Sequence, residues 1–523
     1  MNAWKQTRRG ALCAIASFAA ACSAFHERPT RDPESTPEIP PHRVASPARA
    51  GMDPGRAGVM TGSPAGQGAT GGMVAGADGA GAGAGTSAVS PATPIDAGPA
   101  HAMSEWRMPG YDLGSTYFNS AETRLTRDNA AQLEVAWTAD MGSNVYGAAL
   151  QVGDKIFASS STSVQAFDAA SGQVLWTAMA ASNGALAFED DRLYLGTFQS
   201  LIALDAATGR QLWAKPRDPE QRTDGMSSPV VAGELLLTGG SNGGIELTRE
   251  PFRGFVVALD RVTGDPVWLE HTVPAGASGV GIWSTPSVDL AADRVYVTTG
   301  NNYGPPATDT SDAFMAFDLK TGAVQWKNQR LANDLGPGGG GAVGDLEFGA
   351  NPVLYEVKVD GVTTKVAAAG QKSGEAHALR RDDGMELWRR MLCTGSADGR
   401  AGMMSNSSWS GRHMLFGCSE NGGAKLFALD GATGDVVWMR VLSGEVWSRI
   451  ASANGVGAVG VGRSLELFDV DTGALIKTFP TRGTVASTIT IANGRVAFGE
   501  GLSWATGSAG RTLTVLALPQ RDP

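Results

Sequence analysis

The chain has 523 residues, of which 42% are hydrophobic and 18% charged, and its formal net charge is −10 at pH 7. A nucleic-acid partner would need a basic stripe, and the sequence contains no cluster of Lys and Arg, so we exclude that class of ligand. Covalently attached haem is excluded as well, because no Cys-x-x-Cys-His motif occurs.

The first residues predict an export signal. Three basic residues among the first nine precede an uncharged run, Ala11 to Ala21, that is too short to span a bilayer as a permanent helix. Cys22 follows three alanines, where a bacterial lipoprotein signal would be cut and the thiol acylated. Ordinary cleavage and a twin-arginine route through Arg8 and Arg9 are the alternatives. We therefore expect residues 1–22 to direct the protein to the periplasm, or to the outer membrane as a lipid-anchored protein.

Residues 23–103 predict a flexible linker. This stretch is rich in Pro, Gly, Ala and Ser and has hardly any bulky apolar side chains. Such a composition cannot offset the entropy lost on ordering. A tether of this kind would let the folded part, residues 104–520, stand off a membrane.

The folded part repeats one pattern, in which an apolar run ends in Asp, a turn of the form x-x-Thr/Ser-Gly follows, and a second apolar run closes with Trp. Five copies are complete, with their turns at Asp168, Asp205, Asp260, Asp318 and Asp430. Two are altered: Arg380 replaces the Asp before Trp388, and Lys477 holds the Trp place after Asp469. Each copy predicts two strands joined by a tight turn, because Gly accepts positive φ and Asp closes the turn on backbone donors.

A repeat of about 40–60 residues made of short strands indicates radially stacked sheets. We therefore predict an all-β fold, an eight-bladed β-propeller. After the last copy, Val485 to Ile491, Arg495 to Phe498 and Thr512 to Leu518 predict inner strands without a Trp strand. Leu133 to Trp137 is a Trp-ending strand without a preceding hairpin. Pairing of the first and last of these segments would close the ring.

The spacing of the repeat points to long loops on three consecutive blades. From Asp168 to Asp205 the step is 37 residues, whereas the next three steps, which end at Arg380, are 55, 58 and 62. The extra residues must form loops. These loops contain carboxylate and amide side chains at Glu246, Glu250, Asn301, Asn302, Asp345 and Glu347. Such oxygens suit a hard cation such as calcium, although Asp and Asn are also common in solvated turns.

Two residues are notable for their position in the repeat, and two cysteines for the pairing that they predict. Trp283 begins a blade instead of ending one, so its indole could face the channel, where a planar ligand could stack. Lys372 also begins a hairpin, and is either an ordinary strand charge or a partner for an anionic cofactor. Cys393 and Cys418 predict a structural disulfide in an oxidising compartment.

Several segments carry a resemblance to a known family. They are Trp106 with Gly110-Tyr111-Asp112, Asn119 and Glu122; Arg253 to Asp260; Thr299-Gly300-Asn301; Ala307 to Asp312; and Gly370-Gln371-Lys372-Ser373-Gly374. From about Trp106 to Leu518 the chain resembles the quinoprotein alcohol dehydrogenases, which use pyrroloquinoline quinone (PQQ), and in particular the polyvinyl alcohol dehydrogenases. The repeated hairpin is that family's tryptophan-docking motif.

The resemblance implies a role for each channel residue. Trp283 would form the floor under the quinone, with Ser241 and Lys372 as further cofactor contacts. Calcium would be bound by Glu246 or Glu250, by Asn301 and by Asp345, with Glu347 as an extra metal ligand. Asp345 would be the catalytic base. Lys372 would contact the quinone oxygens and stabilise the negative charge that develops on them. The Arg that usually grips a cofactor carboxylate near Asn183 and Gly184 is missing.

Two classes of function follow from this resemblance. The first is PQQ- and calcium-dependent oxidation of a small or polymeric alcohol, with electrons passed to an external cytochrome or quinone. The second is a non-catalytic binding propeller similar to the lipoprotein scaffold of outer-membrane protein assembly, which keeps the docking hairpins but needs no metal loop. A sensor that binds the quinone without turnover is a third, less favoured reading.

Overall fold

The computed structural model describes residues 104–519 except for short gaps at 183, 247–249, 337–343, 397–398, 405–406 and 503–509. These residues belong to one compact unit, Ser90–Pro523. The predicted export signal, 1–22, and linker, 23–103, lie outside the described residues. Within the described part of the chain, no helix is both long and apolar enough to cross a membrane.

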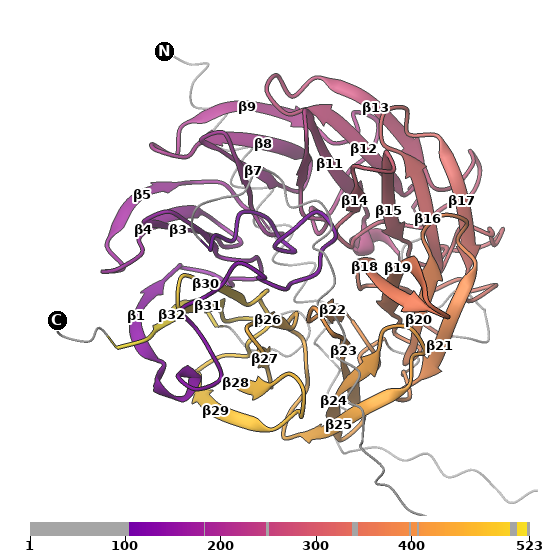
Figure 1. Cartoon of the computed structure of the whole chain (residues 1–523). Coiled ribbons are helices and arrows are strands. Elements are labelled where there is room, and N and C mark those ends of the chain that lie inside the picture. Colours follow the sequence, from indigo (N-terminus) through magenta and orange to yellow (C-terminus); the bar gives the residue numbers. More distant parts are fainter. Residues whose placement is uncertain are drawn as a thin grey trace, which may run out of the picture. The chain divides into compact units, whose positions relative to one another are not determined.

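The described strands form eight four-stranded antiparallel sheets, which Figure 1 shows as blades around a common centre. The first four blades, each given from its innermost to its outermost strand, are β2 (Leu150–Val152), β3 (Lys155–Ser159), β4 (Val164–Asp168) and β5 (Val174–Ala178); β6 (Ala187–Glu189), β7 (Arg192–Gly196), β8 (Ser200–Asp205) and β9 (Gln211–Pro216); β10 (Val230–Ala232), β11 (Leu235–Gly240), β12 (Phe255–Asp260) and β13 (Pro266–His271); β14 (Ser287–Asp289), β15 (Arg294–Thr298), β16 (Ala313–Asp318) and β17 (Val324–Gln329).

The remaining blades follow in chain order. They are β18 (Val353–Val359), β19 (Val362–Gly370), β20 (Glu375–Arg380) and β21 (Glu386–Met391); β22 (Ser407–Trp409), β23 (His413–Glu420), β24 (Gly423–Asp430) and β25 (Val436–Leu442); β26 (Ala451–Ala453), β27 (Val456–Gly460), β28 (Ser464–Asp469) and β29 (Leu475–Pro480); β30 (Thr490–Ala492), β31 (Arg495–Gly499), β32 (Thr512–Ala517) and β1 (Glu134–Asp140). Two short 3₁₀ helices, η1 (Ala130–Gln132) and η2 (Gly243–Ile245), lie in loops.

The eighth blade closes the ring as the sequence predicts. Strand β1 pairs with β32 in antiparallel register, so that Glu134 lies opposite Ala517 and Asp140 opposite Thr512. One expected strand is shorter than predicted, because β30 covers only Thr490–Ala492, while Val485 forms an isolated bridge to Glu500. Seven of the eight innermost strands have three residues, whereas β18 has seven and pairs along its whole length with β19.

The hairpin turns have the chemistry that the repeat predicts. In the turn after β16, the backbone N–H and the hydroxyl of Thr321 donate to Asp318 Oδ1 at 2.9 and 2.8 Å. Gly322 follows with φ +74°, in the left-handed region that favours glycine. The turn therefore needs both the Asp and the Gly of the motif.

Tryptophans dock each blade onto the next. The indole N–H of Trp268 donates to Leu319 O at 3.0 Å, and its ring covers Gly322, where an added Cβ would lie only 2.6 Å from the indole. Lys477, which replaces a Trp in the repeat, keeps the donor function, because its ammonium donates to Leu133 O at 2.6 Å. The docking position thus supplies a donor to the neighbouring blade even where the aromatic ring is lost.

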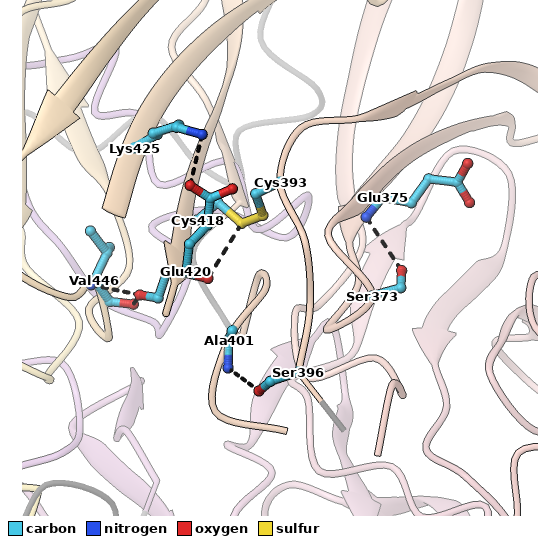
Figure 2. The surroundings of a disulfide bond; sticks show 10 residues. Ser373, Glu375, Cys393, Ser396, Ala401, Cys418, Glu420, Lys425 and Val446 are labelled. Atoms are coloured by element: carbon cyan, nitrogen blue, oxygen red, sulfur yellow. Dashed lines mark hydrogen bonds and ion pairs between the residues drawn. A yellow bond between two sulfur atoms is a disulfide. The ribbon is translucent and has the colours of Figure 1, made fainter. Parts of the chain in front are cut away.

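A disulfide joins two neighbouring blades. Cys393, just after β21, is bonded to Cys418 in β23, with the two Cα atoms 6.4 Å apart. Figure 2 shows this bond between the two blades. The bond confirms the pairing that the sequence predicts.

Replacing Gly322 by Ala tests the docking. We expect the Gly322→Ala protein to lose about 1–3 kcal/mol of stability, because the new methyl group meets the Trp268 ring and φ is unfavourable. Gly361→Ala is the matched control, since Gly361 also has positive φ but has no atom within 4 Å of an added Cβ. Denaturant unfolding of both variants gives the difference. Equal losses would contradict a docking role for the indole.

Candidate active site

The predicted site residues come from loops at one end of three consecutive blades. Glu246 follows β11, Asn301 follows β15, and Lys372 follows β19, while Asp345 and Glu347 precede β18. In an antiparallel blade, the residues before the first strand lie beside those after the second strand. The insertions in the repeat therefore meet at the same end of the ring.

A buried ion-pair cluster lies at the centre of this arrangement. The Lys372 ammonium is 2.7 Å from Asp345 Oδ1 and 2.9 Å from Glu347 Oε1. Lys372 is only 5% exposed, and its backbone N–H donates to Glu347 O at 3.1 Å. The lysine is therefore a buried bridge between two carboxylates and not an ordinary strand charge.

Asn301 connects this cluster to Glu246. Its backbone N–H donates to Glu347 Oε2 at 3.0 Å, and its side-chain Nδ2 donates to Glu246 Oε1 at 2.6 Å. The other amide atom, Oδ1, is buried and has no hydrogen-bond partner among the described residues. Glu250, the alternative to Glu246 in the sequence, is exposed. The structure thus brings Glu246 to Asn301.

Trp283 lies beneath the lysine. The Lys372 ammonium is 5.2 Å from the centroid of the Trp283 ring, which is half-buried. A Cβ at Gly349 would overlap this ring, so the glycine leaves the room that the indole occupies. The blade-starting tryptophan therefore lies next to the charged cluster.

Trp447 is a site neighbour that the sequence analysis missed. It packs in one apolar cluster with Trp283, Met404 and Tyr146, which come from separate blades. Its sequence context contains a usable signal, because Trp447-Ser448 stands four residues before β26 as Trp283-Ser284 stands four residues before β14. A search for repeated blade-starting tryptophans would have found it.

Ser241 lies beside the site but in a different hydrogen-bond network. Its hydroxyl donates to Asp224 Oδ1 at 2.7 Å, and the N–H of Gly243 donates to Asp224 Oδ2 at 3.1 Å. Asp224 therefore fixes the loop that leads to Glu246. It stands in an ordinary Asp-Gly turn, so no sequence pattern distinguished it.

The electrostatics of the site reflect an excess of buried carboxylates. Burial, and then the neighbouring carboxylates of Glu347 and Asp345, raise the pKa of Glu246 to about 8. The pKa of Glu347 is also raised, chiefly by burial, although Lys372 opposes the shift. Burial lowers the pKa of Lys372, but the Glu347 and Asp345 carboxylates outweigh it and raise the value above its usual range.

A fully buried aspartate adds to this excess. Asp312 is 0% exposed, and neither of its carboxylate oxygens has a hydrogen-bond partner within the described part of the chain. Burial raises its pKa well above the usual value, and the carboxylates of Asp334 and Glu347 add to the shift. The site therefore favours either protonated carboxyl groups or an additional cation.

No three His, Cys, Asp or Glu side chains of the described residues converge as a ready metal cage. The arrangement explains this, since the Lys372 ammonium occupies the space between Asp345 and Glu347. The nearest partner of Glu246 is the Asn301 amide. Asn301 and three of the predicted acidic ligands are thus gathered in one network, with an ammonium in place of a metal ion.

Sequence comparison finds relatives among quinoprotein dehydrogenases. The chain is 34% identical over 229 residues to polyvinylalcohol dehydrogenase of Sphingopyxis sp. (strain 113P3), a match that covers 36% of this chain and 33% of that protein. It is 33% identical over 176 residues to polyvinylalcohol dehydrogenase of Pseudomonas sp., covering 28% of this chain and 26% of that protein. The chain thus matches about a third or less of the length of these relatives.

Structural comparison agrees on the fold. The quinohemoprotein alcohol dehydrogenase from Comamonas testosteroni superposes with a TM-score of 0.68 at 19% identity, covering 80% of this chain and 82% of that one. A family model described as outer membrane protein assembly factor BamB matches residues 72–337 and 372–511. The resemblance to the quinoprotein alcohol dehydrogenases is thus confirmed, and the chain belongs to the family of PQQ-type propeller proteins that this model represents.

Proposed function

We propose that this protein is an enzyme that oxidises an alcohol to the carbonyl compound, with PQQ and calcium as cofactors. The observation that carries the proposal is the buried bridge of Lys372 between Asp345 and Glu347 above the Trp283 ring. Burying a charged network is costly. The similarity to polyvinylalcohol dehydrogenases supports the same reaction class.

The residues around Trp283 fit a flat, anionic cofactor. The ring is half-buried, and the Lys372 ammonium lies over it at 5.2 Å. An indole face favours stacking of a planar molecule, and the ammonium favours the negative charge of a quinone and its carboxylates. Ser241, which directly precedes Asn242 and Gly243 in the neighbouring loop, is a further proposed contact. When bound, PQQ would supply the hydride-accepting chemistry.

The residues around Asn301 fit a hard cation. Asn301 Oδ1 is a buried acceptor without a partner among the described residues, while Nδ2 of the same amide donates to the Glu246 carboxylate. Two glycines leave the space that these side chains use: a Cβ at Gly336 would lie 2.5 Å from Glu246 Oε1, and one at Gly300 would overlap Glu347. Carboxylate and amide oxygens are ligands that calcium prefers. We propose Glu246, Asn301, Asp345 and Glu347 as its ligands.

The side chains of this chain would then divide the work of proton transfer and orientation. Asp345 offers a carboxylate oxygen to accept the alcohol proton, and Lys372 holds that carboxylate in place at 2.7 Å. The Lys372 ammonium would stabilise negative charge that develops on the cofactor oxygens. Trp447 and Met404, which pack against Trp283, would exclude water from the reacting face.

Partners and location complete the proposal. The sequence lacks a haem attachment motif, so electrons would pass to an external cytochrome or quinone. We propose an exported protein of the periplasm or outer membrane, with a lipid anchor at Cys22. The substrate would be a small alcohol or a secondary alcohol group of a polymer, in line with the names of the relatives.

A non-catalytic scaffold is the second candidate. The family model that matches the chain is described as outer membrane protein assembly factor BamB, which favours a binding propeller. A scaffold would keep the docking hairpins but would show no dependence on Asp345 or on the quinone. Activity measurements therefore separate the two candidates.

The first prediction concerns the base. With PQQ and calcium added, the full chain should reduce an electron-accepting dye in the presence of primary, secondary or polymeric alcohols, and Asp345→Asn should lower kcat about 10²–10⁴-fold. Asp309→Asn is the control, because Asp309 is an exposed partner of Lys327 outside the site. If the two variants behave alike, or if no dye is reduced, the scaffold candidate is favoured.

The second prediction concerns Trp283, which is proposed to stack under the quinone. Trp283→Leu should weaken binding of PQQ by roughly tenfold or more, because the stacking face is lost. Titration of absorbance or intrinsic fluorescence measures the dissociation constant without turnover. Trp268→Leu, which removes a docking indole, controls for general loosening of the blades. Unchanged affinity in the Trp283 variant would exclude it as the quinone floor.

The third prediction concerns pH and metal. Glu246 has a pKa of about 8 in the folded protein against a usual value of 4.5, so the folded state retains a proton that the unfolded chain releases. Metal-free protein should therefore lose stability as pH rises between these two values. Melting temperatures across this range should show the fall, and Glu246→Gln should reduce it.

Calcium should reverse this trend in the wild type. A bound cation favours the ionised carboxylate, so adding calcium to chelator-treated protein should raise the melting temperature more at pH 8 than at pH 5. The Glu246→Gln protein should show a smaller increase. An equal calcium effect in both proteins would remove Glu246 from the ligand set.

A further inference from the structure

The segment that follows β21 lies against the turn that carries Lys372. We call the described residues of this stretch, 392–396 and 399–403, the clasp segment, and residues 371–374 the lysine turn. Four backbone hydrogen bonds join them: Leu392 N–H and Cys393 N–H to Gly374 O at 2.9 and 3.4 Å, Gly395 N–H to Ser373 O at 3.0 Å, and Met403 N–H to Gln371 O at 3.2 Å. The described residues of the clasp segment thus contact both ends of the lysine turn.

Glycines bring the clasp segment into contact with the ion pair itself. A Cβ at Gly395 or at Gly402 would overlap Lys372 O, so both glycines pack directly on the lysine backbone. On the other side, a Cβ at Gly399 would overlap Asp345 Oδ2. The segment therefore contacts both members of the Lys372–Asp345 pair. A change in its position would alter the packing around both residues.

Strand β23 holds both ends of the clasp segment. At the start, Cys393 is bonded to Cys418. At the end, Gly402 N–H donates to Ser419 O at 2.7 Å, and Ser419 N–H donates to Gly402 O at 3.1 Å. Figure 2 shows Cys393 bonded to Cys418 and, separately, the Ala401 N–H donating to the Ser396 hydroxyl. The disulfide and the Ser419 bridge attach to adjacent residues, so together they tie the segment into a closed loop.

Ser419 extends this connection toward the aromatic side of the site. The N–H of Val446 donates to the Ser419 hydroxyl at 3.0 Å, and Val446 precedes Trp447. One short stretch of β23, Cys418 and Ser419, is therefore connected to the lysine turn through the clasp segment. The same stretch contacts Val446, next to Trp447, directly.

We propose that the Cys393–Cys418 disulfide is a positioning element for Lys372. By fixing the clasp segment on β23, the bond holds the lysine turn where the ammonium bridges Asp345 and Glu347. Backbone hydrogen bonds are individually weak, so without the covalent tie the start of the segment would depend on a few exchangeable contacts. The bond's importance for catalysis rests on the proposed function, but its effect on the lysine turn does not.

Hydrogen exchange of the full chain, without quinone or metal, tests the proposal. A dithiol supplies two electrons and two protons, so the S–S bond breaks to two thiols while the reagent becomes a cyclic disulfide. Mass spectrometry should then show the amides of the lysine turn and clasp segment exchanging about tenfold faster or more. Peptides from the outer part of the same blade, β20 and β21, and from β24 and β25 should be unchanged.

Two variants keep the test decisive. Cys393→Ser/Cys418→Ser should reproduce the effect of reduction. Gly402→Ala should also speed exchange of the lysine turn with the disulfide intact, because its Cβ would overlap Lys372 O and φ is +96°. Unchanged exchange in the lysine turn would overturn the proposal. Faster exchange throughout both blades would also overturn it, since the bond would then stabilise both blades as a whole and not the lysine turn in particular.

Failure of the proposed function would appear in a different measurement. If the oxidised protein neither binds PQQ nor reduces the dye, the enzyme assignment fails whatever the exchange data show. If it does bind, the disulfide-free protein should bind PQQ at least about tenfold more weakly at a temperature where its secondary structure is intact. Equal affinity would overturn the catalytic consequence of the positioning role.

Discussion

The docking of one blade's outer strand onto the turn of the next is the interaction on which the rest of the structure depends. A four-stranded sheet cannot bury both of its faces alone, so each blade needs its neighbours. The Trp268 indole meets this need by covering Gly322 and donating to Leu319 O. Lys477 donates to backbone carbonyls from the equivalent position, whereas the Trp213 ring covers Gly264 although its indole N–H has no hydrogen-bond partner among the described residues. Neither the donor nor the aromatic ring is therefore kept at every docking position.

Fixed blades make a precise central site from residues far apart in the sequence. Glu246 and Lys372 come from loops on different blades, yet both are linked to Glu347 through Asn301 or directly. The low-dielectric surroundings strengthen these pairs and also penalise unbalanced charge. With Asp312 buried and unpaired among the described residues, the site carries more acidic groups than its ammonium can neutralise. This imbalance is what makes a cationic ligand chemically reasonable.

The sequence reveals the fold well because the repeat is local. Asp, Gly and Trp of one hairpin stand within nine residues, and their turn and docking roles follow from their chemistry. The length of an inner strand is harder to predict, as the Val485 segment shows, because an apolar pattern does not distinguish an isolated bridge from a continuous strand. Ring closure by β1 could be predicted because the sequence contains both incomplete parts of the blade: a Trp-ending strand without a hairpin, and inner strands without a Trp strand.

Only part of the candidate site could be predicted from the sequence. The repeat spacing points to the loops of Asp345 and Asn301, but the individual roles of these residues follow only from the family resemblance, and the residues alone left Lys372 with two interpretations. Asp224 and Asp312 have meaning only through burial and neighbours from other loops, so no local pattern marks them. The contact of the clasp segment with the lysine turn likewise depends on the fold, although both cysteines were plain in the sequence.

The eighth blade has a consequence for how the protein is made. Its outermost strand, β1, is synthesised first, and its partner, β32, is synthesised more than three hundred and seventy residues later. During translation the seven intervening blades can stack in order, while β1 remains without its partner. The ring becomes complete only when the last strand arrives. Assembly of this propeller therefore ends with a single fastening step that a prematurely terminated chain cannot perform.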